Sequence, residues 1–201
     1  MNKNRLEAFS DGVLAIIITI MVLEFKIPIG NEWIVLKPLI PKFIAYGLSF
    51  AYVGIYWGNH HHLLQPVKHV SSKLILSNLN LLFWLSLIPF TTSWLSDNNF
   101  SSNPMALYSA ILFNCAISYY ILQKFVEKHT HSIDALPEAF KKMRRKGNIS
   151  FSLNLISIPI ALFAPFISFI FLTIVAIIWL VPDKNIEKVL FENSQNEDQA
   201  E

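Results

Sequence analysis

Apolar residues occur in long runs along this chain, and polar residues gather between the runs. A bilayer core about 30 Å thick is crossed by roughly 20 apolar residues in an α-helix. The runs predict six such helices, at about residues 6–25, 43–62, 72–94, 104–125, 149–163 and 165–181. We therefore expect an all-α integral membrane protein in which residues 1–182 form one six-helix transmembrane domain.

Prolines help to place the limits of these helices. Pro104 stands where the fourth helix is expected to begin, since proline at a first helical position loses no hydrogen bond. Pro89 lies inside the third run and is expected to kink it or to mark its last turns. The uncharged run 149–181 is too long for one ordinary span. Ala164-Pro165 in its middle predicts a tight turn between two shorter helices.

Basic residues divide unevenly between the two sides that six spans create. Thirteen of the sixteen Lys and Arg residues fall on the side that holds both termini, and only Lys26, Lys37 and Lys42 fall on the other. Cytoplasmic loops of membrane proteins carry an excess of Lys and Arg. We therefore expect both termini, with a polar tail over residues 183–201, in the cytoplasm.

Composition excludes several other classes of protein. The chain is 53% hydrophobic and 15% charged, whereas soluble domains carry about 25% charged residues. Cys115 is the single cysteine, which excludes an internal disulfide and a cysteine-rich metal site. The net charge of +2 is small and scattered, so we expect no nucleic-acid binding.

The first helix carries an acid at its mouth. A charged group in lipid costs about 2.5–3.5 kcal/mol on insertion scales, so Asp11 should face protein or an aqueous path. Beyond it, Ile16, Ile20 and Leu23 share one helix face, with Thr19 between them. This stripe is either a seam packed against another helix or the lining of a pore, and periodicity does not decide. A pore built from it would need several copies of the chain around a symmetry axis.

The start of this helix resembles the signature of the transmembrane protein 175 family, which comprises the bacterial relatives of the lysosomal potassium channel. The residues that carry this resemblance are Arg5, Phe9, Ser10 and Asp11. Weaker matches follow in Trp57-x-Asn59-His60-His61, in Asn78 and Asn80, and in Ile88-Pro89-Phe90-Thr91-Thr92. The resemblance covers about residues 3–180.

The resemblance implies a potassium-preferring cation channel that conducts by passive electrodiffusion. It implies a homotetramer in a bacterial inner membrane, surrounded by lipid, with helix 1 lining a central pore. The pore constrictions would fall on Ile16, Ile20 and Leu23, and Thr19 would contribute to ion selectivity. Potassium is the permeant ion, other monovalent cations pass less well, and no catalysis, organic cofactor or metal is implied. The chain also lacks the glycine-rich filter loop of ordinary potassium channels.

We interpret the opening motif as a clamp that holds the pore helix, rather than as a direct ion contact. Arg5 and Asp11 are six residues apart and do not stack on one helix face. Each is expected to find partners on neighbouring helices near the same end of the molecule. The expected members of this clamp network are Arg5, Phe9, Ser10, Asp11, Trp57, Asn59, His60 and Asn78, with His61 as a further candidate.

Two other classes of function are weighed against the channel. A secondary transporter could bind its substrate with Asp11 and with the asparagines Asn78, Asn80, Asn114 and Asn154. A membrane enzyme could use the histidines after Asn59, but the chain lacks a second spaced histidine set, a nucleophile elbow and a carboxylate pair. Three adjacent histidines point about 100° apart on a helix and cannot all reach one metal ion.

Overall fold

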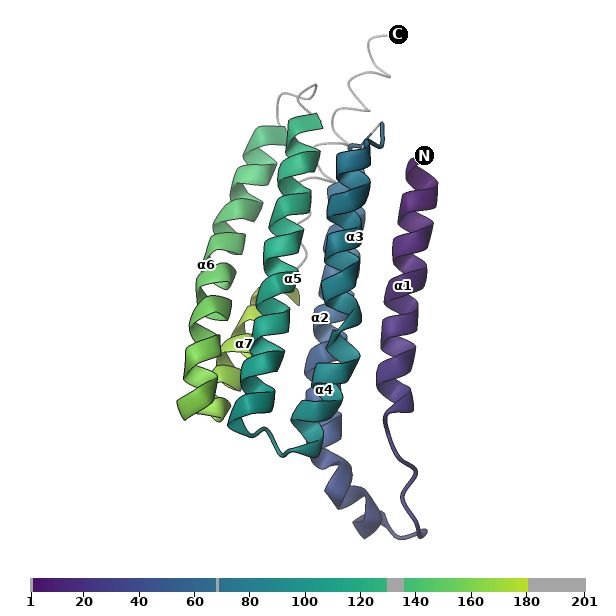
Figure 1. Cartoon of the computed structure of the whole chain (residues 1–201), viewed down its shortest axis with the longest axis vertical. Helices are drawn as coiled ribbons and strands as arrows, with labels where there is room; N and C mark the ends of the chain where they lie inside the picture. Colours follow the sequence, from purple (N-terminus) through teal and green to yellow (C-terminus); the bar gives the residue numbers. More distant parts are fainter. Residues whose placement is uncertain (1, 68, 130–135, 181–201) are drawn as a thin grey trace.

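The structure, a computed structural model, describes residues 2–67, 69–129 and 136–180, with the backbone alone at residues 129 and 136–144. Over these ranges the chain forms a bundle of long helices that run nearly parallel to one axis (Figure 1). The elements are α1 (Lys3–Leu23), the 3-10 helix η1 (Trp33–Leu39), α2 (Ile40–Leu64), α3 (Ser72–Ser86), α4 (Ile88–Asp97), α5 (Ser102–His129), α6 (Leu136–Phe163) and α7 (Pro165–Leu180). The polar tail predicted at residues 183–201 lies outside the described residues.

Local signals account for several helix ends. The side chain of Asn2 accepts a hydrogen bond from the backbone N–H of Asn4 at the start of α1, at 3.2 Å. The Ser71 hydroxyl caps α3 in the same way by accepting from the Leu74 N–H, at 3.3 Å. Such caps satisfy backbone donors that have no partner inside the helix. A proline in the first turn of α2 needs no such partner.

The expected disturbance at Pro89 is a break between two helices that stack end to end. α3 ends at Ser86 and α4 begins at Ile88, with Leu87 between them. Proline has no N–H to donate to the preceding turn, so the helical ladder is interrupted there. The Thr91 hydroxyl donates to the carbonyls of Leu87 and Ile88, at 3.3 and 3.1 Å, which supports the first turn of α4.

The helix before the Ala164-Pro165 turn is longer than the apolar run that predicted it. α6 begins at Leu136, whereas the apolar run begins at residue 149. The added part is rich in Lys and Arg, which are good helix formers but unfavourable in lipid. Hydropathy therefore located the lipid-compatible part of this helix and not its start. The turn itself lies where it was expected, because α7 begins at Pro165.

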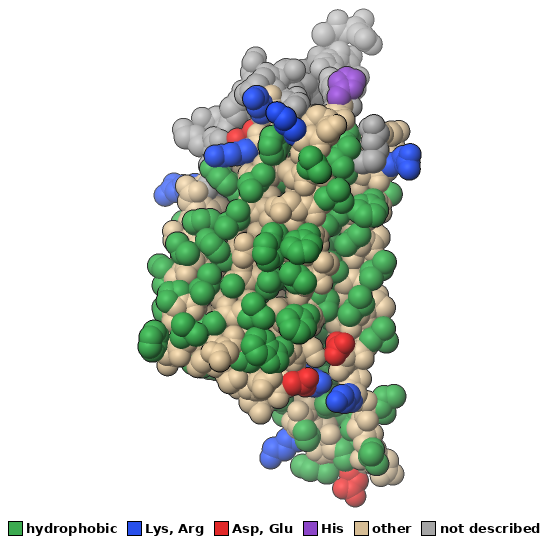
Figure 2. All heavy atoms as spheres, in the orientation of Figure 1, with side chains coloured by type: hydrophobic (Ala, Val, Ile, Leu, Met, Phe, Trp, Pro, Cys, Tyr) green, Lys and Arg blue, Asp and Glu red, His purple; other side chains and the backbone are tan. Residues whose placement is uncertain are grey.

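The surface of the bundle is apolar over its middle. In Figure 2 hydrophobic side chains cover the central part of the visible face, and charged side chains gather toward the two ends. Among the described residues, four helical stretches are long and apolar enough to cross a membrane, and α7 is a shorter apolar helix. Those stretches are Lys3–Leu23, Trp33–Leu64, Ser72–Asp97 and Ser102–Lys128.

Buried polar contacts tie the inner helices together and leave α1 at one edge. The Ser49 hydroxyl of α2 lies 2.7 Å from that of Thr92 on α4 and 2.9 Å from that of Tyr108 on α5. Tyr52 of α2 donates to the Leu172 carbonyl of α7 at 2.8 Å. α1 packs mainly against α2, α3 and α4, and Figure 1 shows it at the margin of the bundle. One long face of α1 is therefore uncovered in the single chain.

Candidate functional site

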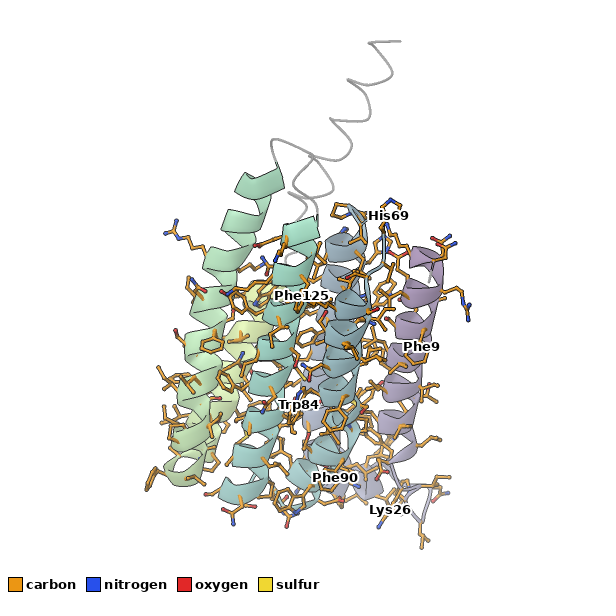
Figure 3. The ribbon with its side chains drawn as sticks, turned by 45° about the horizontal axis from the view of Figure 1, so that its top comes forward. Phe9, Lys26, His69, Trp84, Phe90 and Phe125 are labelled. Atoms are coloured by element: carbon orange, nitrogen blue, oxygen red, sulfur yellow. The ribbon has the colours of Figure 1, made fainter. Side chains whose placement is uncertain are left out.

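α1 has two faces with opposite environments. The residues buried against the rest of the chain recur every three or four positions, as one helix face requires. They are Leu6, Ser10, Leu14, Ile17 and Met21. Figure 3 shows Phe9 on this helix, near one end, and Lys26 just beyond the other. The buried face fixes how α1 sits, and therefore which of its side chains are presented outward.

The predicted constriction residues all lie on the outward face. Ile16 is 60% exposed, Ile20 is 42% exposed and Leu23 is 75% exposed. The stripe therefore does not pack against another helix of the described chain. The packing seam considered from the sequence is excluded within one subunit. An uncovered apolar face of this kind contacts lipid or another copy of the chain.

Thr19 lies on the same outward face and is exposed. Its hydroxyl donates a hydrogen bond to the Ala15 carbonyl one turn earlier, at 2.8 Å. Because the proton is directed back along the helix, the oxygen lone pairs remain free to accept from water or to contact a cation.

A buried hydrogen-bonded chain joins three helices near the N-terminal end of α1. The Asn78 amide of α3 donates to the Ser10 hydroxyl at 2.9 Å, and its carbonyl oxygen lies 2.6 Å from His60 Nε2 of α2. Ser10 in turn donates to the Leu6 carbonyl at 2.8 Å. Ser10 and Asn78 are 0% exposed and His60 is 3% exposed. This chain links α1 to α2 and α3 in the region where the sequence predicts a clamp.

Asp11 is bound by a tryptophan on the neighbouring helix. Trp57 of α2 donates from Nε1 to an Asp11 carboxylate oxygen at 3.0 Å, and both side chains are exposed. The carboxylate is thus attached to α2 while it stays accessible from outside the subunit.

Three of the expected network members form no hydrogen bond or ion pair with the other members among the described residues. Arg5 is exposed and forms no ion pair with a described residue, and Phe9 is 53% exposed. Asn59 donates to the Ile55 carbonyl of its own helix at 2.8 Å. It follows Trp57 by two residues, which turns it about 200° around α2 and away from α1. The sequence placed these residues at the correct end of the bundle but could not assign their facing.

The far end of α1 is held by an attachment that was not expected from the sequence. Lys42 at the start of α2 forms an ion pair of 2.8 Å with Asp97 and donates to the Glu24 carbonyl at 3.3 Å. The Glu24 carboxylate accepts from Ser93 of α4 at 3.0 Å. The sequence does show oppositely charged residues near three helix ends. It does not show that Lys42 pairs with Asp97, because that depends on which helices are neighbours.

The polar groups considered for a transporter do not gather at one place. Asn78 belongs to the buried chain, whereas Asn80 donates to Ser118 of α5 at 2.7 Å. Asn114 donates to the Ala110 carbonyl of its own helix at 2.8 Å. Among the described residues no three His, Cys, Asp or Glu side chains are grouped to hold a metal ion. Asn78, Asn80 and Asn114 therefore supply structural bonds. Asn154 lines a cavity to which Asp11 and the other three asparagines do not contribute, so the five residues define no shared substrate site.

The apolar helices and their end-clustered charges define an integral, multi-pass, all-α membrane protein. The chain belongs to the family of the endosomal/lysosomal potassium channel TMEM175, whose family description matches residues 5–89. A potassium channel of Chryseobacterium sp. (strain P1-3) is 50% identical over 193 residues, which cover 96% of this chain and 100% of the relative. A potassium channel of Streptomyces collinus is 32% identical over 84% of this chain and 85% of its own length.

A solved structure confirms the fold. The crystal structure of a homolog of the lysosomal potassium-selective channel TMEM175 from Chamaesiphon minutus matches with a TM-score of 0.76 and 24% identity. The match covers 90% of this chain and 97% of that one. The sequence-based predictions of the family and of the all-α membrane fold are thus confirmed. The family and these relatives are channels and not enzymes.

Proposed function

We propose that this protein is a potassium channel that conducts by passive electrodiffusion. The observation that carries the proposal is the 50% identity to a potassium channel over the whole of that relative. The exposed apolar stripe of α1 supports it, because the single chain leaves this face uncovered and available to line a path between copies.

We propose further that the working channel is a homotetramer with α1 around a central axis. Ile16, Ile20 and Leu23 then form apolar constrictions that gate by excluding water, and the outward lone pairs of Thr19 replace part of the hydration shell of the ion. One hydroxyl layer supplies fewer ligands than stacked carbonyl rings, so the preference for potassium over sodium is expected to be weak. The exposure of all four side chains supports this arrangement.

The proposed setting is a bacterial inner membrane with both termini in the cytoplasm. The described Lys and Arg residues fit this orientation. Lys3, Arg5 and Lys146 belong to helix ends that share the N-terminal end of the bundle, and the opposite end has only Lys26, Lys37 and Lys42. Membrane lipid and potassium are the proposed partners besides the chain itself, and no cofactor is required for electrodiffusion.

Purified protein in planar bilayers under a potassium/sodium gradient tests the function directly. The native chain should conduct and give a reversal potential displaced toward potassium. Ile16→Asn should raise open probability because a polar ring is wetted more easily than an apolar one. Leu23→Ala should widen the pore and raise conductance, and Thr19→Ala should move the reversal potential toward zero.

Matched substitutions on α7 control for effects of membrane insertion. Ile177 is 59% exposed, nearly the same as Ile16, so Ile177→Asn places the same polar group on a helix outside the proposed pore. Thr173 donates to the Phe169 carbonyl at 2.9 Å as Thr19 does to Ala15, so Thr173→Ala removes an equivalent hydroxyl. Equal effects from the α1 and α7 variants would exclude α1 as the pore helix.

A further inference from the structure

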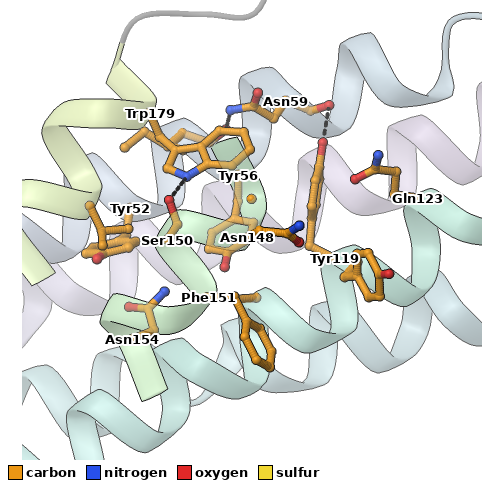
Figure 4. Close-up of a pocket in the computed structure, with 15 residues that line it drawn as sticks. Tyr52, Tyr56, Asn59, Tyr119, Gln123, Asn148, Ser150, Phe151, Asn154 and Trp179 are labelled. Atoms are coloured by element: carbon orange, nitrogen blue, oxygen red, sulfur yellow. Dashed lines mark hydrogen bonds between the residues drawn. The ribbon is translucent and has the colours of Figure 1, made fainter. Parts of the chain in front are cut away.

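A cavity of about 260 Å³ lies among α2, α5, α6 and α7, away from α1 (Figure 4). Six of its lining residues are aromatic, including Tyr56, Tyr119, Phe151 and Trp179. One water molecule occupies about 30 Å³ of liquid, so the cavity has room for a small organic molecule. It is separate from the proposed ion path, because α1 contributes none of the described lining residues.

A deeply buried polar atom in the cavity wall has no hydrogen-bond partner among the described residues. The Asn154 side chain of α6 is 2% exposed, and its Oδ1 accepts no hydrogen bond from the described residues. Figure 4 shows the Asn154 side chain at the cavity wall, with its amide nitrogen on the side of the Tyr56 ring. Leaving a buried acceptor unsatisfied costs about 1–3 kcal/mol, so this oxygen is available to a molecule that can donate a hydrogen bond to it.

Several other polar groups of the wall are held by bonds within the protein. Trp179 Nε1 donates to Ser150 at 2.7 Å, and Tyr119 donates to the Asn59 carbonyl at 3.2 Å. The Tyr52 hydroxyl is bound to a carbonyl of α7. These bonds fix the aromatic rings before any ligand arrives, which reduces the ordering that binding would require.

The wall favours an uncharged ligand. None of the described lining residues is Asp, Glu, Lys or Arg. Two lysines are engaged by wall rings: Lys124 Nζ lies 4.6 Å from the Tyr120 ring centre, and Lys146 Nζ lies 4.7 Å from that of Trp179. An ion placed inside would lose its hydration without a countercharge in the lining.

We propose that this cavity binds an uncharged, flat organic molecule that carries one carboxamide-like group. The flat body packs between the rings of Tyr56, Phe151 and Trp179, and the carboxamide both donates to and accepts from the Asn154 amide. The proposal concerns binding alone, so it stands or falls independently of the ion that the channel conducts.

Photolabelling of the purified full chain in lipid nanodiscs tests the proposal. The probe is benzamide with a para trifluoromethyl diazirine, and free benzamide is the competitor. Labelled peptides from α2, α5, α6 and α7 are located by mass spectrometry. We expect saturable labelling at the aromatic wall that benzamide suppresses, with benzoate and ethylbenzene much weaker as competitors.

Three variants separate recognition from partition into lipid. Asn154→Leu should weaken competition by benzamide about tenfold, the loss of roughly one buried hydrogen bond, without weakening ethylbenzene. Ala116→Phe, at a half-buried wall position, should abolish labelling by filling the cavity. Asn114→Leu, on α5 like Ala116 but outside the cavity lining, should leave labelling unchanged. Elution as an intact assembly shows that each variant is folded.

Four results would overturn the proposal. They are labelling that does not saturate, labelling that survives Ala116→Phe, competition by benzoate equal to that by benzamide, and competition by ethylbenzene equal to that by benzamide. The last result would identify the cavity as a slot for hydrocarbon, such as a lipid chain, and not as a site that recognises an amide.

Discussion

At the scale of single residues, the Thr19 hydroxyl and three apolar side chains lie on the outward face of α1. The Asp11 carboxylate, in contrast, is hydrogen-bonded to Trp57 of α2. Asp11 accepts from Trp57, and its cost in a membrane is reduced by that bond. The Thr19 hydroxyl donates its hydrogen bond to a carbonyl of its own helix. These two geometries suit the different roles that we propose for Asp11 and Thr19, attachment for the first and contact with the ion for the second.

The Thr19 geometry predicts a graded set of variants. Thr19→Ser keeps the oxygen and should keep most of the preference for potassium. Thr19→Val keeps the branched shape without the oxygen and should reduce the permeability ratio about threefold to tenfold, the equivalent of one hydrogen-bond-sized contact. Reversal potentials under bi-ionic conditions measure the ratio. Equal ratios in Thr19→Ser and Thr19→Val would show that the hydroxyl does not meet the ion.

Asp11 separates attachment from ion contact in the same way. Asp11→Asn retains an oxygen acceptor for Trp57 and should leave assembly nearly unchanged. Asp11→Ala removes the acceptor and should lower the fraction of intact assemblies, without changing selectivity among the channels that still form. Native mass spectrometry and reversal potentials report the two quantities separately. Normal assembly with lost potassium preference in Asp11→Ala would instead assign the carboxylate to the ion path.

At the scale of elements, α1 is fastened near both ends and uncovered between them. The buried chain through Asn78 acts near its start, and the contacts of Glu24 with Lys42 and Ser93 act at its end. The Leu87 break lies beside this second attachment, since α4 carries Ser93. Ser93, which follows the break on α4, therefore contacts Glu24 directly after the end of α1, where the outward-facing stripe also ends.

Removal of the Asn78 amide should weaken the attachment of α1 to α2 and α3 and leave the other helix contacts in place. Asn78→Leu leaves the buried Ser10 and His60 groups without their partner and should destabilise the fold by roughly 3 kcal/mol. The matched control is Asn80→Leu, which breaks a bond between α3 and α5 and spares α1. Hydrogen exchange of α1 amides should rise in the first variant only. Equal exchange in both would mean that α1 is held by apolar packing alone.

The success of the sequence predictions differed between properties. The family motif and the apolar runs identified the fold, and Pro89 and Ala164-Pro165 marked interruptions that the structure contains. The start of α6 was missed because helix propensity continues where hydropathy ends. The facing of Asn59 and the Lys42–Asp97 pair were missed because they depend on which helices are neighbours, which a single sequence does not specify.

At the scale of the whole molecule, the fold is a rigid inner group of helices with α1 displayed at its margin. Serine, threonine and tyrosine hydroxyls link α2, α4, α5 and α7, which suits a body that keeps its shape. Such a body positions α1 without enclosing it, so the proposed pore would depend on contact between copies.

This arrangement predicts a disulfide-trapped assembly. The cysteine variant Leu23→Cys places a thiol on the most exposed stripe position, in a chain whose native Cys115 is buried. Oxidation of protein in membranes should give linked dimers if copies of α1 meet around an axis. The control Leu76→Cys, at a position 66% exposed on α3, should give none. Disulfide-linked dimers formed only by Leu76→Cys would place the subunit interface at α3 and contradict a pore lined by α1.

The display of the proposed pore-lining face on the margin of each subunit has a genetic consequence. If four copies share one conduit, a cell that makes native and blocked chains in equal amounts retains only roughly one-sixteenth all-native assemblies. A substitution on the outward stripe would then behave as dominant, whereas one that unfolds the inner helices would remove its own chain and behave as recessive. The same polypeptide would thus carry two classes of harmful allele, distinguished by which face of one helix they alter.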